Sequence, residues 1–114
     1  MAIITNKHNV THYTWGNNCD GWPLAETPGL SVKQENMPAG TREQLHYHKT
    51  AQQYFYILKG TATFYCENDE FIVSAQTGIL INAGTQHYVA NQSNTTLEFL
   101  VISQPSTQND RMNV

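Results

Sequence analysis

Apolar and polar positions along the chain alternate mainly with a period of two, and no segment sustains the 3.6-residue period of an amphipathic helix. Short runs of branched and aromatic residues are separated by turns containing Gly, Asn, Asp and Pro. We expect strands over residues 30–37, 43–48, 53–59, 61–67, 70–74, 79–81, 87–90 and 96–103. Many short strands at this spacing favour an all-β sandwich or barrel in a single domain.

The two ends of the chain differ from this middle part. Residues 1–28 hold both tryptophans, Trp15 and Trp22, among polar and turn residues. We expect an N-terminal strand or arm there that packs on the barrel or on a partner subunit, and we place the barrel over residues 29–104. The polar residues 105–114 are expected to form a loose C-terminal tail.

Composition and charge narrow the classes of protein. A chain of 114 residues with 39% hydrophobic and 13% charged residues is a folded single domain rather than a disordered chain. A net charge of -3 and scattered Lys and Arg residues argue against a nucleic-acid partner. No apolar run is long enough to span a bilayer, and the N-terminus lacks a signal-peptide pattern. We therefore expect a cytoplasmic protein without membrane partners, in which Cys19 and Cys66 are free thiols.

Three histidines carry the clearest chemical signal. His46 and His48 are two residues apart on an expected strand, so their imidazoles share one face. His87 lies near the start of another expected strand, which a closed barrel can bring to the same point. Neutral imidazoles suit a borderline divalent cation, so the pattern indicates a metal site. The alternative for each histidine alone is a hydrogen-bonded residue of the barrel interior.

The spacing around these histidines resembles the two motifs of the cupin superfamily. The first motif, G-x5-H-x-H-x3,4-E-x6-G, is matched at Gly40, His46, His48 and Gly60, and Gln53 occupies the glutamate position. The second motif, G-x5-P-x-G-x2-H-x3-N, is matched at Gly84, His87 and Asn91. Asn82 and Gln76 stand where the proline and the first glycine are usual. The chain looks most like the small single-domain bacterial cupins described as mannose-6-phosphate-isomerase-like.

This resemblance implies a fold, a metal and an assembly. The fold is the all-β double-stranded β-helix, or jelly-roll barrel, of cupins. The metal is one divalent transition ion, which can be Fe, Zn, Ni, Mn or Co. Its ligands are His46, His48 and His87, with Gln53 in the fourth place. Cupins commonly pair through their sheets, so the resemblance implies a homodimer.

Gln53 departs from the family pattern and changes the expected charge of the site. Glutamine offers a neutral carbonyl oxygen in place of a carboxylate. Three neutral imidazoles and a neutral amide leave a divalent ion with its full +2 charge. We therefore expect weaker metal binding and stronger attraction of anionic ligands. The alternative is that Gln53 only lines the core or hydrogen-bonds to a bound water.

Strand parity predicts which residues surround the metal. If Gln53 faces inward, Phe55 and Ile57 do too, and we expect both to line a substrate pocket. Gln34 is a candidate polar pocket residue, with a surface position as the alternative. Glu43 has the opposite parity to His46, so we expect it to face solvent. No catalytic acid or base other than a metal-bound water is identifiable.

Two functions remain open from the sequence. The first is a metal-dependent enzyme that acts on a small anionic or oxygen-rich organic molecule, with dioxygenase- or isomerase-type chemistry. The second is a non-catalytic cupin that binds a small ligand or a sugar. Because this fold carries both kinds of protein, the choice depends on the site rather than on the fold.

Overall fold

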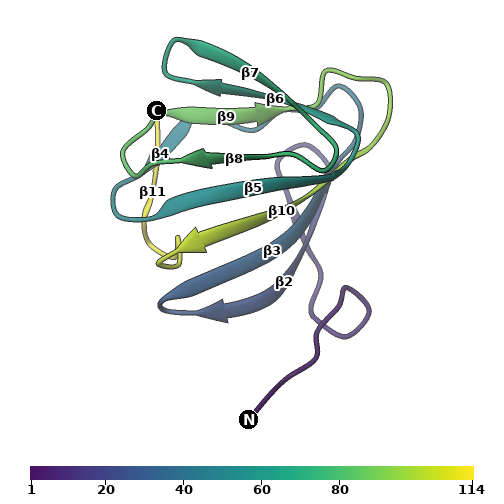
Figure 1. The fold of residues 1–114 in the computed structure, drawn as a ribbon, viewed down its shortest axis with the longest axis vertical. Helices are drawn as coiled ribbons and strands as arrows, with labels where there is room; N and C mark the ends of the chain where they lie inside the picture. The colour runs from purple at the N-terminus through teal and green to yellow at the C-terminus, as the bar shows by residue number, and fades with distance from the viewer.

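The computed structural model describes all 114 residues as strands, turns and loops, with eleven strands in two antiparallel sheets (Figure 1). The order in the six-stranded sheet is β1-β2-β3-β10-β5-β8, and in the five-stranded sheet β11-β4-β9-β6-β7. The strands are β1 (Tyr13–Trp15), β2 (Cys19–Thr27), β3 (Leu30–Met37), β4 (His46–His48), β5 (Gln52–Lys59), β6 (Thr61–Cys66), β7 (Asp69–Ser74), β8 (Gly78–Ile81), β9 (His87–Ala90), β10 (Leu97–Gln104) and β11 (Arg111–Asn113). This arrangement confirms the expected all-β jelly-roll fold. No helix is long and apolar enough to cross a membrane.

The period-two pattern places one face of each central strand in the interior. On β10, Leu97, Phe99 and Val101 are buried, and on β5 Phe55 and Ile57 are buried. The intervening residues of both strands are more exposed. The pattern therefore gave the correct strands and the correct inward face of β5, because alternate side chains of a strand point to opposite sides of the sheet.

Aromatic side chains hold the two sheets together. Phe55 packs against Phe64 of the five-stranded sheet and Phe99 of the six-stranded sheet, with ring centroids 5.0 and 5.6 Å apart. Such pairs add about 0.5–1.5 kcal/mol each to the effect of burying the rings. Phe55 also lines the principal cavity, so the apolar core forms part of that cavity's wall.

The first residues extend the six-stranded sheet. β2 pairs with β3 along almost its whole length, and β1 adds a further strand at the edge. The β2–β3 hairpin therefore spans residue 29, so the domain boundary that we placed there separates two paired strands of the same sheet. Both cysteines are unpaired, as the sequence led us to expect.

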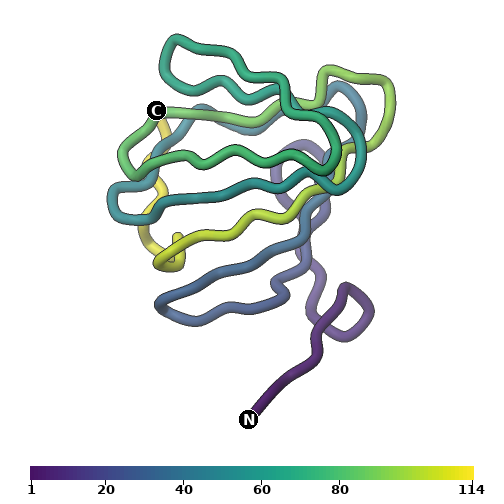
Figure 2. The backbone as a smooth tube through the Cα atoms, in the orientation of Figure 1, coloured from purple at the N-terminus to yellow at the C-terminus, as the bar shows by residue number.

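The C-terminal residues do not form the expected loose tail. They return along the molecule to β4, far from the N-terminus (Figure 2), and β11 pairs with that short strand. The carboxylate of Asp110 accepts hydrogen bonds from the backbone N–H groups of Lys49, Thr50 and Ala51 at 2.9–3.2 Å. Polar composition misled the prediction because these contacts use backbone groups and one carboxylate rather than apolar burial.

Glycines at two turns allow the histidine-bearing segments to meet. Gly60 lies between β5 and β6 with φ +89°, and an added Cβ would stand 3.0 Å from a backbone oxygen. Gly84 has φ +83°, and its N–H donates to the carbonyl of His48 at 2.7 Å. A non-glycine residue is strained at these φ values. The turn at Gly84 thus joins the two motif segments directly.

Candidate metal centre

The three predicted histidines converge between neighbouring strands. His46 and His48 lie on β4, and His87 lies opposite His46 on β9. All three are buried, and each offers a ring nitrogen within 4.8 Å of those of the other two. This cluster can hold a metal ion.

Hydrogen bonds define the tautomers of two of these imidazoles. Nδ1 of His46 lies 2.8 Å from the carbonyl oxygen of Gln44, and Nδ1 of His87 lies 2.8 Å from that of Thr85. A carbonyl oxygen only accepts, so Nδ1 carries the proton in both neutral rings. Nε2 therefore has a free lone pair in both rings. The hydrogen bond at Nδ1 fixes the orientation of each ring, as in metal-ligating histidines.

Several buried polar atoms at this point have no hydrogen-bond partner in the protein. They are Nε2 of His87, Oε1 of Gln53 and both ring nitrogens of His48, of which one carries the proton of the neutral ring and the other is an acceptor. The amide nitrogen of Gln53 donates to the hydroxyl of Ser103 at 3.1 Å, which leaves its carbonyl oxygen free. An unpaired buried acceptor costs about 1–3 kcal/mol. A group of such acceptors without a donor has the chemistry of a divalent metal site.

Burial keeps these histidines neutral. It lowers the pKa of His46 to about 3 and that of His48 to about 4, and the charge of Arg111 acts in the same direction on both, whereas Asp110 opposes the change at His48. Burial also lowers the pKa of His87. Neutral imidazole is the form that binds metal, so the site is competent for a metal at neutral pH.

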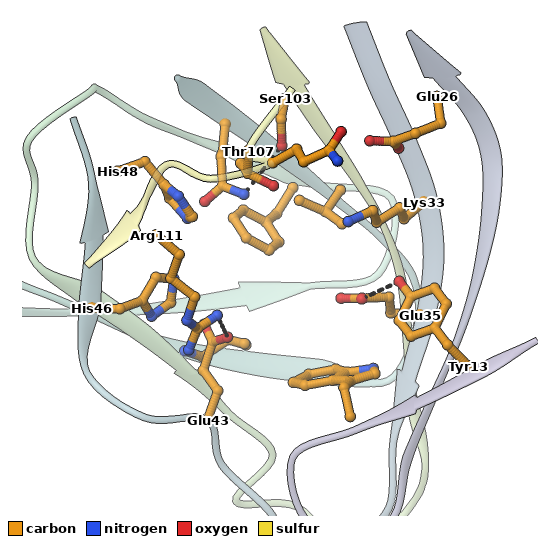
Figure 3. Close-up of a pocket in the computed structure, with 16 residues that line it drawn as sticks. Tyr13, Glu26, Lys33, Glu35, Glu43, His46, His48, Ser103, Thr107 and Arg111 are labelled. Atoms are coloured by element: carbon orange, nitrogen blue, oxygen red, sulfur yellow. Dashed lines mark hydrogen bonds and ion pairs between the residues drawn. The ribbon is translucent and has the colours of Figure 1, made fainter. Parts of the chain in front are cut away.

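A cavity of about 560 Å³ opens beside the histidines. His46, His48 and Gln53 line one end, together with Arg111 of β11. Figure 3 shows Tyr13, Glu35 and Lys33 on the side opposite the two histidines. The cavity therefore has a histidine end, defined by His46, His48, Gln53 and Arg111, and a glutamate end, defined by Tyr13, Lys33 and Glu35.

Glu43 lies in the cavity wall, so the expectation that it faces solvent is wrong. Residues 43–45 are not strand, and the period of two does not extend back from His46 to Glu43. One oxygen of Glu43 accepts the N–H of Val89, and the other lies 3.7 Å from Arg111. Burial raises the pKa of Glu43 to about 8, and Arg111 opposes this rise.

The predicted pocket residues fall in three different places. Phe55 lines the cavity, whereas Ile57 is fully buried in the apolar core. Gln34 is not in the cavity wall, and its neighbours Lys33 and Glu35 are. The cavity meets the face of β3 that carries Lys33 and Glu35, so the face that carries Gln34 lies outside it because alternate side chains point to opposite sides of the sheet.

Tyr13, Glu35 and Arg111 are among the cavity residues that sequence reasoning missed. Tyr13 and Arg111 come from the two ends of the chain, which carry no motif. The alternation of residues 30–37 was the one available signal for Glu35, and it left open which face is buried.

The family model for the cupin domain matches residues 33–103, and the chain belongs to the cupin family. Its strands and its three-histidine cluster are those that the motif resemblance implied.

Three similar proteins set this chain among its relatives. It is 32% identical over 75 residues to an uncharacterized protein of Methanocaldococcus jannaschii and 30% identical over 66 residues to an oxalate-binding protein of Thermotoga maritima. These matches cover 66% and 58% of this chain, but only 60% and 54% of the relatives' lengths. The structure of KdgF from Halomonas sp. has a TM-score of 0.84 at 15% identity, with 95% of this chain and 98% of that chain covered. That likeness concerns the fold.

Proposed function

We propose that this cupin binds one divalent metal through His46, His48, His87 and Gln53, and uses it as an enzyme acting on a small carboxylate. The observation that carries the proposal is the set of buried acceptors without donors at the histidine end of the cavity. A bound divalent ion would supply Lewis-acid chemistry by polarising an oxygen of the ligand.

The charge at the histidine end of the cavity supports an anionic ligand. Two cations and three glutamates line the whole wall, and Arg111 is the cation beside the histidines. Burial favours the uncharged form of Glu43, which reduces the negative charge beside Arg111. The relative named as an oxalate-binding protein supports a small carboxylate as well.

The cavity's dimensions and ionisable groups favour an enzyme over a binding protein. A volume of about 560 Å³ falls within the usual range of small-molecule sites, about 300–1,000 Å³. Tyr13, Glu35 and Glu43 are groups able to exchange protons within the same cavity. The non-catalytic alternative rests on the name of the Thermotoga maritima relative, which describes binding.

Metal and oxalate titrations test this proposal. Purified protein stripped of metal would be titrated with Zn²⁺, Ni²⁺, Mn²⁺ and Fe²⁺ by calorimetry, and the bound metal counted by mass spectrometry. We expect one ion per chain, and oxalate binding only to the loaded protein. Failure to bind stoichiometric metal, or oxalate binding that ignores the metal, would refute it.

We also propose a homodimer. Tyr54 and Leu80 are exposed neighbours on paired strands of the six-stranded sheet, and Phe71 and Ile72 are exposed on β7. Covering such side chains is favourable by about 25 cal/mol per Å² of apolar surface. Light scattering at micromolar concentration should give the mass of two chains, and a monomer would exclude the dimer.

A further inference from the structure

Three glutamates line the cavity, and the protein satisfies two of them fully. Both carboxyl oxygens of Glu26 accept hydrogen bonds from serine hydroxyls, at 2.6 and 2.9 Å. One oxygen of Glu43 accepts the N–H of Val89, and the other pairs with Arg111. These contacts give each oxygen of Glu26 and Glu43 a partner in the protein.

Glu35 differs from both. Tyr13 donates its hydroxyl proton to Oε2 of Glu35 at 2.5 Å, and Oε1 accepts no hydrogen bond from the protein. Oε1 is not among the inaccessible polar atoms that lack a hydrogen-bond partner, so it is accessible from the cavity that Glu35 lines. Figure 3 shows this carboxyl group facing the space that separates it from His46 and His48. One oxygen held and the other open is the geometry of a positioned proton-transfer group.

The surroundings of Glu35 favour a strong base. Burial raises the pKa of Glu35, whereas the hydrogen bond from Tyr13 and the charges of Lys33 and Arg111 oppose the rise. A carboxylate with a raised pKa is a stronger base than an ordinary glutamate. The titratable and charged groups that face it are Tyr13, Cys19, Glu26, Lys33, Glu43 and Arg111.

We propose that Glu35 is a catalytic residue that takes a proton from a carbon next to a carbonyl group of the substrate and returns it, and that Tyr13 positions it. The proposal rests on the function proposed above, because the substrate's oxygens are held at the histidine end. The C–H bond breaks, its proton passes to a carboxylate oxygen of Glu35, and the bonding electron pair moves towards the carbonyl oxygen. Return of the proton re-forms a C–H bond and the carboxylate, so no oxidant or reductant is needed.

Hydrogen exchange of pyruvate in D₂O tests this step. Zinc-loaded protein should exchange the methyl hydrogens of pyruvate, followed by ¹H NMR. Glu35→Gln should slow the exchange by at least about 100-fold, the lower end of general-base contributions, while zinc content stays unchanged and oxalate still binds. Tyr13→Phe should slow it less and move the midpoint of its pH profile upward, because the lost hydrogen bond favours the carboxylate form.

A matched pair outside the cavity provides the controls. The hydroxyl of Tyr65 donates to exposed Glu70 at 3.2 Å, and neither residue lines the cavity. Glu70→Gln and Tyr65→Phe should leave the exchange unchanged. A second readout needs no metal: in the infrared difference between metal-free wild type and Glu35→Gln, followed over a pH titration, the C=O stretch of the protonated Glu35 carboxyl group should persist to higher pH than that of an ordinary glutamate.

The outcomes separate this proposal from the one on which it rests. Exchange at the wild-type rate in Glu35→Gln, no exchange by wild-type protein that binds zinc and oxalate, or a protonated carboxyl signal that does not persist above the pH of an ordinary glutamate would each overturn the role of Glu35. Failure of the wild-type protein to bind zinc, or to bind oxalate when loaded with zinc, would instead overturn the proposed function.

Discussion

The two ends of the cavity differ in the polar groups that have no hydrogen-bond partner in the protein. Beside the histidine end, Nε2 of His87 and Oε1 of Gln53 are buried without a hydrogen-bond partner. At the glutamate end, Tyr13 donates a hydrogen bond to one oxygen of Glu35, and the other oxygen has no partner in the protein. The first end suits the proposed cation and the second suits the proposed proton transfer.

Removing one of the three histidine side chains should have the largest effect, because metal binding at the histidine end depends on it. His87→Ala takes away a lone pair that its bond to Thr85 orients. We expect metal affinity to fall by more than about 100-fold, beyond the loss usual for an outer hydrogen-bond partner. His8→Ala, at an exposed position, is the matched control. Calorimetric titration of both variants decides, and unchanged affinity in His87→Ala would place the metal elsewhere.

Acid should weaken the histidine end of the metal-free protein. The pKa of His46 is lowered from 6.5 to about 3, so its contribution to stability is present above pH 6.5 and is lost as the pH falls towards 3. Between pH 7 and pH 5 the wild type should lose about 2 kcal/mol of unfolding free energy relative to His46→Gln. Urea denaturation at both pH values measures this difference. If the difference in unfolding free energy between the wild type and His46→Gln is the same at both pH values, then folding does not hold His46 neutral.

Changing the fourth group should move two affinities in opposite directions. Gln53→Glu places a carboxylate where the unpaired Oε1 lies. Metal affinity should rise roughly tenfold, because an anionic ligand replaces a neutral one, and oxalate affinity should fall roughly fivefold, because the net charge of the site drops by one. Ser103→Ala, which removes only the partner of the amide nitrogen, is the companion variant. If both affinities move together, Gln53 does not contact the metal.

The smallest effect is expected from the C-terminal segment. Asp110→Asn weakens the bonds that tie β11 to the residues directly after His48. Metal affinity should fall roughly fivefold, since β11 pairs with the strand that carries two ligands. Asp69→Asn, at an exposed position in the β6–β7 hairpin, should change nothing. A competing chelator would measure the metal dissociation rates of the two variants. Equal rates would mean that the C-terminal segment does not support metal binding.

The histidine end could be predicted from the sequence because its residues obey a local spacing. His46 and His48 share a strand face by parity, and the glycines that turn the chain are part of the same pattern. The eight strands between residues 30 and 104 followed from the same period of two, and most of their ends shifted by at most a single residue, whereas β11 was expected to be a loose tail. Local geometry therefore sufficed for the central strands and for bringing the three histidines together.

The glutamate end could not be predicted because distant segments build it. Tyr13 and Glu35 are 22 residues apart and meet only after β2 pairs with both β1 and β3. Arg111, the one member of the histidine end that was also missed, reaches the cavity through contacts of Asp110 with backbone groups that composition does not encode. Glu43 was misplaced since strand parity was applied to residues that are not strand.

Anomalous diffraction from crystals of the metal-loaded protein would locate the ion relative to the three histidines. We predict one strong peak about 2.0–2.3 Å from a ring nitrogen of each of His46, His48 and His87, with the side-chain oxygen of Gln53 in the same coordination sphere. A peak elsewhere on the molecule, or no peak at this cluster in crystals whose solution binds stoichiometric metal, would contradict it.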